Sequence, residues 1–170
     1  IQAKRDHGLY RQFSDEQIRV QGFAKLPALV DPYLDQEGLE AMAEYLTPLF
    51  ENDDKCDLDA LTMERIKRSN QRIQNVLAGD LVDLQDIPRV KAMASFYDKH
   101  IRKRVERVKE SKPVALIGKT LIKYLSSTVL ETKPSIANGT PANYAGNRKH
   151  TGGGLNVFGL QGVLHNIDFE

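Results

Sequence analysis

The amino-acid sequence predicts an all-α protein: a single bundle-like domain of about five helices, followed by an irregular, glycine-rich C-terminal arm. Apolar residues recur at three- and four-residue spacing through most of residues 14–131, which is the spacing of amphipathic helices. That spacing stops after Lys133, where nine glycines and prolines interrupt any regular pattern. The chain of 170 residues fits one domain. We therefore expect a helical domain at 1–132 and an extended arm at 133–170.

The first helix is predicted to begin at Ser14. Ser14 and Gln17 have the spacing of a capping box, in which each side chain bonds the backbone N–H of the other residue. Apolar residues continue to Leu26, and the next residue, Pro27, ends the pattern. Pro27 and Pro32 together predict a bent connector.

Two further helices are predicted between residues 35 and 79. Asp35 caps the first, which carries apolar residues on one face and is interrupted near its end by Pro48. An acidic loop is expected at 51–57. The second helix runs from about Leu58 to Ala78, before Gly79. Its predicted solvent face is basic and contains Arg65, Lys67, Arg68 and Arg72.

The last two predicted helices follow Asp86 and Ser111. Residues 89–110 place one apolar stripe on a helical wheel, with a cationic flank beside it that includes an aromatic ring. The stripe consists of Val90, Met93, Tyr97, Ile101, Val105 and Val108. The final helix, from Ser111 to about Leu130, is apolar over a wide face and should be the most buried.

The charges are strongly segregated along the chain. Residues 89–124 contain 11 bases and three acids, whereas residues 31–64 contain 11 acids and one lysine. The net charge of +1 conceals this separation. A basic face attracts polyphosphate by counterion release, and it attracts an acidic protein face by complementarity.

We expect a non-enzymatic nucleic-acid-binding protein that acts as an oligomer through this basic helix face, of the kind used in genome packaging or nucleoprotein assembly. The phosphate contacts would be independent of base sequence. The aromatic ring of Phe96 is expected to stack on a base. The bases expected to contact phosphates are Arg89, Lys99, Arg102, Lys103, Arg107, Lys109, Lys119 and Lys123.

Other readings of the same charges remain open. A scaffold or adaptor domain would use its acidic and basic faces to meet other subunits, through a heterologous contact that makes a homo-oligomer or larger assembly. If the two blocks neutralise each other within one subunit, the charges are only a solvated surface. An enzyme whose site forms only in three dimensions is a further alternative.

The C-terminal arm carries too many apolar residues for a disordered tail, so it should be buried against a surface. We expect a partner, another copy or a larger protein to bind it; the alternative is a strap over the chain's own core. A short strand is conceivable at 155–158. The residues expected to make the contact are Leu155, Val157, Phe158, Leu160, Val163 and Leu164.

The sequence contains no motif that names a reaction. The segment 117–120 ends like a phosphate-binding loop, but Pro113 stands where that loop needs its first glycine. The four histidines are scattered, and Cys56 lies in an acidic stretch unfavourable to a thiolate. We therefore expect no catalytic residue, metal or cofactor. A lone cysteine and the lack of an 18-residue apolar run predict an intracellular protein, cytoplasmic or virion-associated, without a membrane span.

Overall fold

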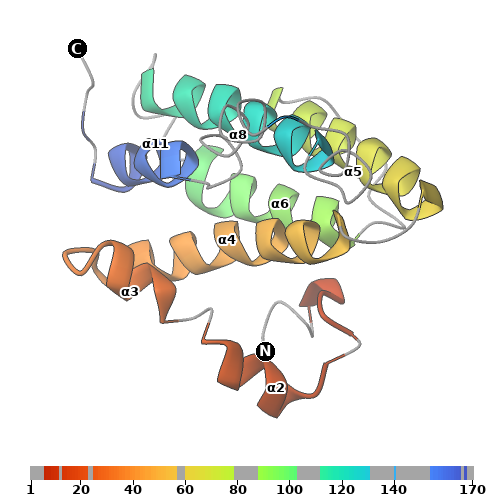
Figure 1. Cartoon of the computed structure of the whole chain (residues 1–170). Helices are drawn as coiled ribbons and strands as arrows, with labels where there is room; N and C mark the ends of the chain where they lie inside the picture. The colour runs from red at the N-terminus through yellow and green to blue at the C-terminus, as the bar shows by residue number, and fades with distance from the viewer. Residues whose placement is uncertain are drawn as a thin grey trace.

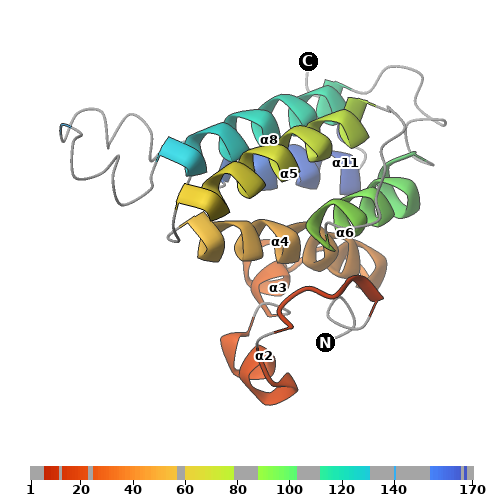
Figure 2. The same cartoon turned by 90° about the vertical axis from the view of Figure 1, so that its right-hand side faces the viewer.

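A computed structural model gives the fold (Figures 1 and 2). It describes residues 6–11, 13–22, 25–56, 60–78, 88–102, 112–130, 140, 154–165 and 167, and the structural statements below concern these residues. The regular structure within them is entirely helical, which confirms the all-α fold class. The elements are α2 (Asp15–Gln21), α3 (Leu26–Val30), α4 (Gln36–Cys56), α5 (Ala60–Ala78), α6 (Pro88–Phe96), the π-helix η1 (Tyr97–Arg102), α8 (Lys112–Leu130) and α11 (Gly154–Leu164).

The helices form a bundle with α5 and α8 side by side along its upper edge in both views (Figures 1 and 2). Helix α6 packs against both α4 and α5, and α11 packs along α8. The short helices α2 and α3 lie below α4 (Figure 1). One core cluster joins α4, α5, α6, η1, α8 and α11; its fully buried side chains include Met42, Tyr45, Ile73, Met93, Phe96, Leu121 and Leu160.

The N-terminal helices depart from the predicted boundaries. The capping box at Ser14 is confirmed: Ser14 Oγ accepts from the Gln17 backbone N–H at 3.1 Å, and Gln17 Oε1 accepts from the Ser14 N–H at 2.7 Å. Helix α2 nevertheless ends at Gln21, because Gly22 adopts a left-handed conformation with φ 70°. The predicted connector contains the short helix α3, which has Pro27 in its first turn, where a missing N–H costs no hydrogen bond.

Helix α4 continues through Pro48 to Cys56, so the predicted interruption and the predicted loop from residue 51 are wrong. Burial on both sides of the proline explains the difference. Leu46 and Leu49 lie in the core, and the buried Glu51 accepts a hydrogen bond from the Tyr10 backbone N–H at 3.1 Å. Burying each leucine contributes ~1.5–3 kcal/mol, so the two together offset the ~3 kcal/mol cost of an internal proline.

The predicted helix 89–110 is present as α6 followed by η1, while residues 103–111 lie outside the described part of the chain. Val90, Met93 and Ile101 of the predicted stripe are buried, as expected. Arg89, Phe96 and His100, which fall on the cationic flank of that helical wheel, are buried too. The flank is buried because α6 is covered by α4 on one side and by α5 on the other, so it turns a wide face inward.

The predicted arm is helical over residues 154–164, and the conceivable strand at 155–158 is therefore wrong. Leu160, Val163 and Leu164 of α11 enter the main core. Gly159 permits a close approach to α8, because a Cβ at this position would lie 3.3 Å from both the Cγ1 atom and the backbone N of Ile117. Helix α11 thus straps the chain's own core. Residues 133–139 and 141–153 lie outside the described residues.

Candidate nucleic-acid interface

The two predicted interface residues of α6 do not reach the surface. Phe96 is 0% exposed, and its ring centroid lies 5.1 Å from that of Tyr45 and 5.6 Å from that of His100. Arg89 is 5% exposed. In this fold, Phe96 is a core residue that cannot stack on a base, and Arg89 offers no exposed guanidinium to a phosphate. Both side chains are buried for the same reason: α4 and α5 cover α6 on two sides.

Lys99 and Arg102 of η1 are exposed but already paired with carboxylates. Lys99 Nζ lies 2.6 Å from Glu44 Oε1, and Arg102 Nη2 lies 2.7 Å from Asp98 Oδ1. Glu44 of α4 and Asp98 of η1 thus neutralise part of the basic segment within one subunit.

Glu44 is the centre of this neutralisation. The imidazole Nε2 of His100 donates to Glu44 Oε2 at 3.0 Å, and this hydrogen bond, with help from Lys99 and against the effect of burial, lowers the pKa of Glu44 to about 2. The hydrogen bond to Glu44 raises the pKa of Lys99, and the charges of Glu40 and Glu37 add to this effect. Lys99 is therefore held as a cation by α4, and a phosphate would have to displace Glu44 to use it.

The remaining predicted bases divide into two groups. Lys103, Arg107 and Lys109 lie outside the described residues. Lys119 and Lys123 are exposed on α8 and form no ion pair with the described side chains. Helix α8 contains three lysines and no acid, so nothing on its own surface neutralises them.

Helix α5 adds bases that our predicted interface omitted. It contains four bases and one acid, and Lys67 and Arg68 are exposed. Lys67 Nζ lies 2.8 Å from Glu64 Oε1; that bond lowers the pKa of Glu64, and the charge of Arg68 adds to the effect. The sequence predicted these bases on the solvent face of the helix at 58–78, but nothing in the sequence indicated that this helix packs beside α8.

Packing places α5 and α8, the two helices that carry these bases, side by side. The buried Asn70 Nδ2 of α5 donates to the Leu125 carbonyl of α8 at 3.1 Å, which fixes the two helices against each other. Lys67 and Arg68 are exposed two or three residues from Asn70, and Lys119 and Lys123 are exposed two to six residues from Leu125. These four bases therefore lie on adjacent helices (Figures 1 and 2). We define the basic surface as the surface formed by Lys67, Arg68, Lys119 and Lys123. The exposed Ile122 lies between the two lysines of α8.

Charge of the opposite sign occupies the other side of the bundle. Helix α4 contains six acids and one lysine, and Asp35, Glu37 and Glu40 are exposed at its beginning. Helix α3 and the beginning of α4 lie below α5 and α8 in both views (Figures 1 and 2). The charge segregation along the sequence therefore becomes a separation in space, apart from the pairs around Glu44.

The apolar residues predicted to bind a partner are largely used within the chain. Leu160, Val163 and Leu164 are buried, and Val157 is half-buried. The side chain of Leu155 lies outside the described ones. Phe158 is 61% exposed, so a partner could reach its side chain. The expectation that these residues form one docking face is corrected, because α11 turns most of them into its own bundle.

Comparisons with known proteins add no relative: no family model, no curated protein and no solved structure matches this chain. Among the described residues, no group of three or more His, Cys, Asp and Glu side chains is placed to hold a metal ion. Within the same part of the chain, no helix combines the length and apolar character needed to cross a membrane.

Proposed function

We propose that this chain is a non-enzymatic nucleic-acid-binding protein that contacts phosphates through the basic surface of α5 and α8. The observation that supports this most is the acid-free helix α8, whose Lys119 and Lys123 are exposed beside the basic helix α5. Lysines that form no ion pair with the described side chains need no rearrangement to meet a phosphate backbone. Such binding would allow the protein to act in genome packaging or nucleoprotein assembly.

The proposed interaction is electrostatic and independent of base sequence. Lysine ammonium groups neutralise phosphates and release condensed counterions, so log affinity falls linearly with log salt concentration. Arg68 adds a planar donor that can bind a phosphate through two N–H groups. Compared with the interface expected from sequence, the proposed one moves from α6 and η1 to α5 and α8, because Lys99 and Arg102 are engaged by carboxylates.

Fluorescence anisotropy with labelled single-stranded and duplex DNA and RNA tests the proposal. The double substitution Lys119→Glu with Lys123→Glu should weaken binding at low salt by at least about tenfold for every base sequence, since several phosphate contacts are lost. The matched control is Arg19→Glu with Lys25→Glu, which changes the net charge equally at exposed positions of α2 and the start of α3. No wild-type binding at low salt, or an equal loss in the control, would contradict the proposal.

A further inference from the structure

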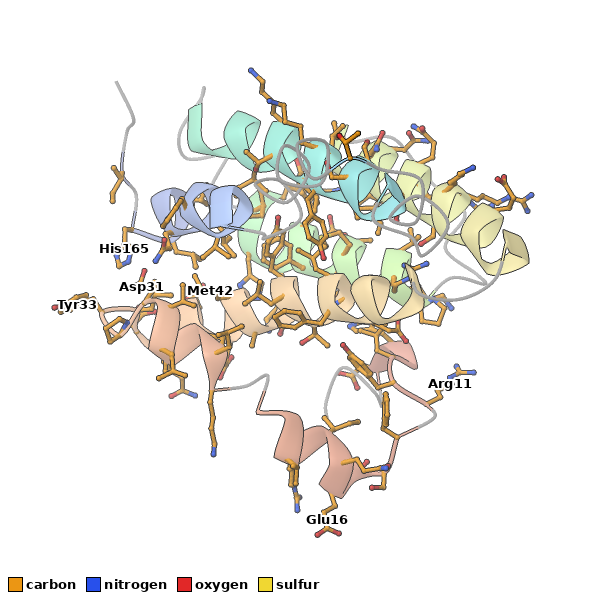
Figure 3. The ribbon with its side chains drawn as sticks, in the orientation of Figure 1. Arg11, Glu16, Asp31, Tyr33, Met42 and His165 are labelled. Carbon is orange, nitrogen blue, oxygen red and sulfur yellow. The ribbon has the colours of Figure 1, made fainter. Side chains whose placement is uncertain are left out.

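A second charged surface with exposed apolar side chains lies on the α3–α4 side of the bundle. Tyr33 is 89% exposed and Leu29 is 79% exposed. Tyr33 points away from the body of the protein (Figure 3). Asp35, Glu37 and Glu40 are exposed immediately beyond them. We call this the acidic–apolar surface and define it by Leu29, Tyr33, Asp35, Glu37 and Glu40.

The acidic–apolar surface has no base within its own segment; Lys99 of η1 is acted on by the charges of Glu37 and Glu40 but forms its ion pair with Glu44. The chain has no lysine or arginine between Lys25 and Lys55. Large exposed apolar side chains rimmed by charge mark protein interaction sites, and tyrosine is enriched at the centres of such interfaces. Its partner should therefore present an apolar side chain surrounded by bases.

The basic surface of the same chain has that chemistry. Ile122 is 42% exposed and lies between Lys119 and Lys123 on the acid-free helix α8. The two surfaces lie on opposite sides of the bundle, with α5 and α8 above and α3 and the beginning of α4 below (Figures 1 and 2). One molecule cannot bring them together, but two molecules can.

We propose that copies of this chain associate head to tail, with the acidic–apolar surface of one copy on the basic surface of the next. Ile122 packs against Tyr33 and Leu29, and Lys119 and Lys123 face Glu40 and its acidic neighbours. Because the two surfaces differ, the contact is heterologous, and the assembly keeps one free acidic–apolar surface at one end and one free basic surface at the other. The inference shares the basic surface with the proposed function but rests on the acidic–apolar surface, which no nucleic acid would use.

Light scattering after size exclusion provides the first test. The wild-type mass at low salt should exceed that of a monomer and rise with concentration, and it should fall at about 1 M salt, where the Debye length is only ~3 Å. Two variants each remove one surface: Tyr33→Ser with Glu40→Gln, and Lys119→Glu with Ile122→Ser. Each should be monomeric at concentrations at least about tenfold above those at which the wild type assembles. Val20→Ser, an exposed apolar position of α2, is the control and should assemble like the wild type.

Mixing the two monomeric variants gives the sharper test. Each still carries the surface that the other has lost, so the mixture should form a one-to-one dimer and nothing larger. A wild type that stays monomeric at low salt, variants that assemble normally, or a mixture that stays monomeric would each overturn the inference.

The proposed function fails separately from this inference. The variant Tyr33→Ser with Glu40→Gln keeps the whole basic surface and should bind DNA at least as well as the wild type under conditions where both are monomeric. Assembly without DNA binding would refute the proposed function alone, and DNA binding by a wild type that never assembles would refute head-to-tail association alone.

Discussion

The imidazole Nε2 of His165 lies 2.7 Å from Oδ2 of Asp31, 134 positions earlier in the chain. The two side chains meet between the end of α11 and the loop after α3 (Figure 3). Gln161 Nε2 donates to the same carboxylate oxygen at 3.1 Å, and the Tyr33 backbone N–H donates to Oδ1 at 3.3 Å. Asp31 is therefore the point at which α11 is tied to the opposite side of the bundle.

Asp31→Asn should loosen this tie in a pH-dependent way. Burial acts to raise the pKa of Asp31, but the hydrogen bonds from His165, Gln161 and Tyr33 together outweigh it, so the pKa lies below its ordinary value. A carboxyl whose pKa is lower in the folded state stabilises the fold above its unfolded pKa, and this contribution is lost as pH falls through the folded pKa. The substitution should cost ~1–2 kcal/mol at neutral pH and much less in acid. Urea unfolding of the variant and the wild type at neutral and at acid pH measures the loss of unfolding free energy. An equal loss at both pH values would contradict the role of the Asp31 carboxylate.

Glu44→Gln tests the neutralisation of the basic segment by α4. The pKa of Glu44 is about 2 in the fold, against an ordinary value of 4.5, so its stabilising effect is complete above pH 4.5 and is lost as pH falls toward 2. We expect a loss of ~1–2 kcal/mol at neutral pH, because the buried His100 loses a charged acceptor. Lys99→Met should cost less than ~1 kcal/mol, since that pair is exposed. Thermal unfolding of both variants shows which substitution lowers the stability more. A larger loss of stability for Lys99→Met would show that Lys99, not His100, is the main partner of Glu44.

Gly159→Val should weaken the packing of α11 on α8. A Cβ at this position meets backbone atoms of Ile117 at 3.3–3.5 Å, which cannot move as a flexible side chain would. Overpacking of this kind typically costs ~1–3 kcal/mol. Gly118→Ala is the control in α8, because its added Cβ meets no atom within 4 Å beyond its chain neighbours and the backbone of its own helix. Alanine is also the better helix former, so the control should be neutral or stabilise by up to ~1 kcal/mol. Equal melting temperatures for Gly159→Val and Gly118→Ala would contradict the close approach of Gly159 to Ile117.

Phe96→Leu separates the core role of Phe96 from the base-stacking role expected from sequence. A completely buried phenylalanine contributes several kcal/mol, and truncation to alanine would cost ~3–5 kcal/mol, so leucine is the variant that keeps the fold. We expect a lower melting temperature and unchanged affinity for single-stranded DNA. A weaker affinity in a variant with the wild-type helical circular dichroism would restore the stacking role.

Local signals in the sequence predicted the helices well. Ser14 and the apolar spacing of α8 act through neighbouring residues, so their effects can be read from the chain itself. Gly22 is an equally local stop signal, but our predicted first helix ran past it. The continuation of α4 through Pro48 depends on burial supplied by other helices and on Tyr10, which no local pattern contains.

The candidate site was less predictable because it depends on neighbours in space. The wheel for residues 89–110 correctly grouped Val90 with Met93, but it could not show that two helices cover α6 and bury Phe96. In the same way, Lys99 is paired with a glutamate 55 residues earlier. The basic surface joins Arg68 to Lys123 only through the packing of α5 on α8.

The salt dependence of duplex DNA binding tests the central claim most directly. Each neutralised phosphate contributes about −0.9 to the slope of log affinity against log salt concentration. Lys119→Ala with Lys123→Ala should therefore make the slope shallower by about 2 relative to the wild type, while Arg19→Ala with Lys25→Ala leaves it unchanged. A slope that is the same in the wild type and in the α8 variant would contradict the account, because it would mean that the basic surface does not contact phosphates.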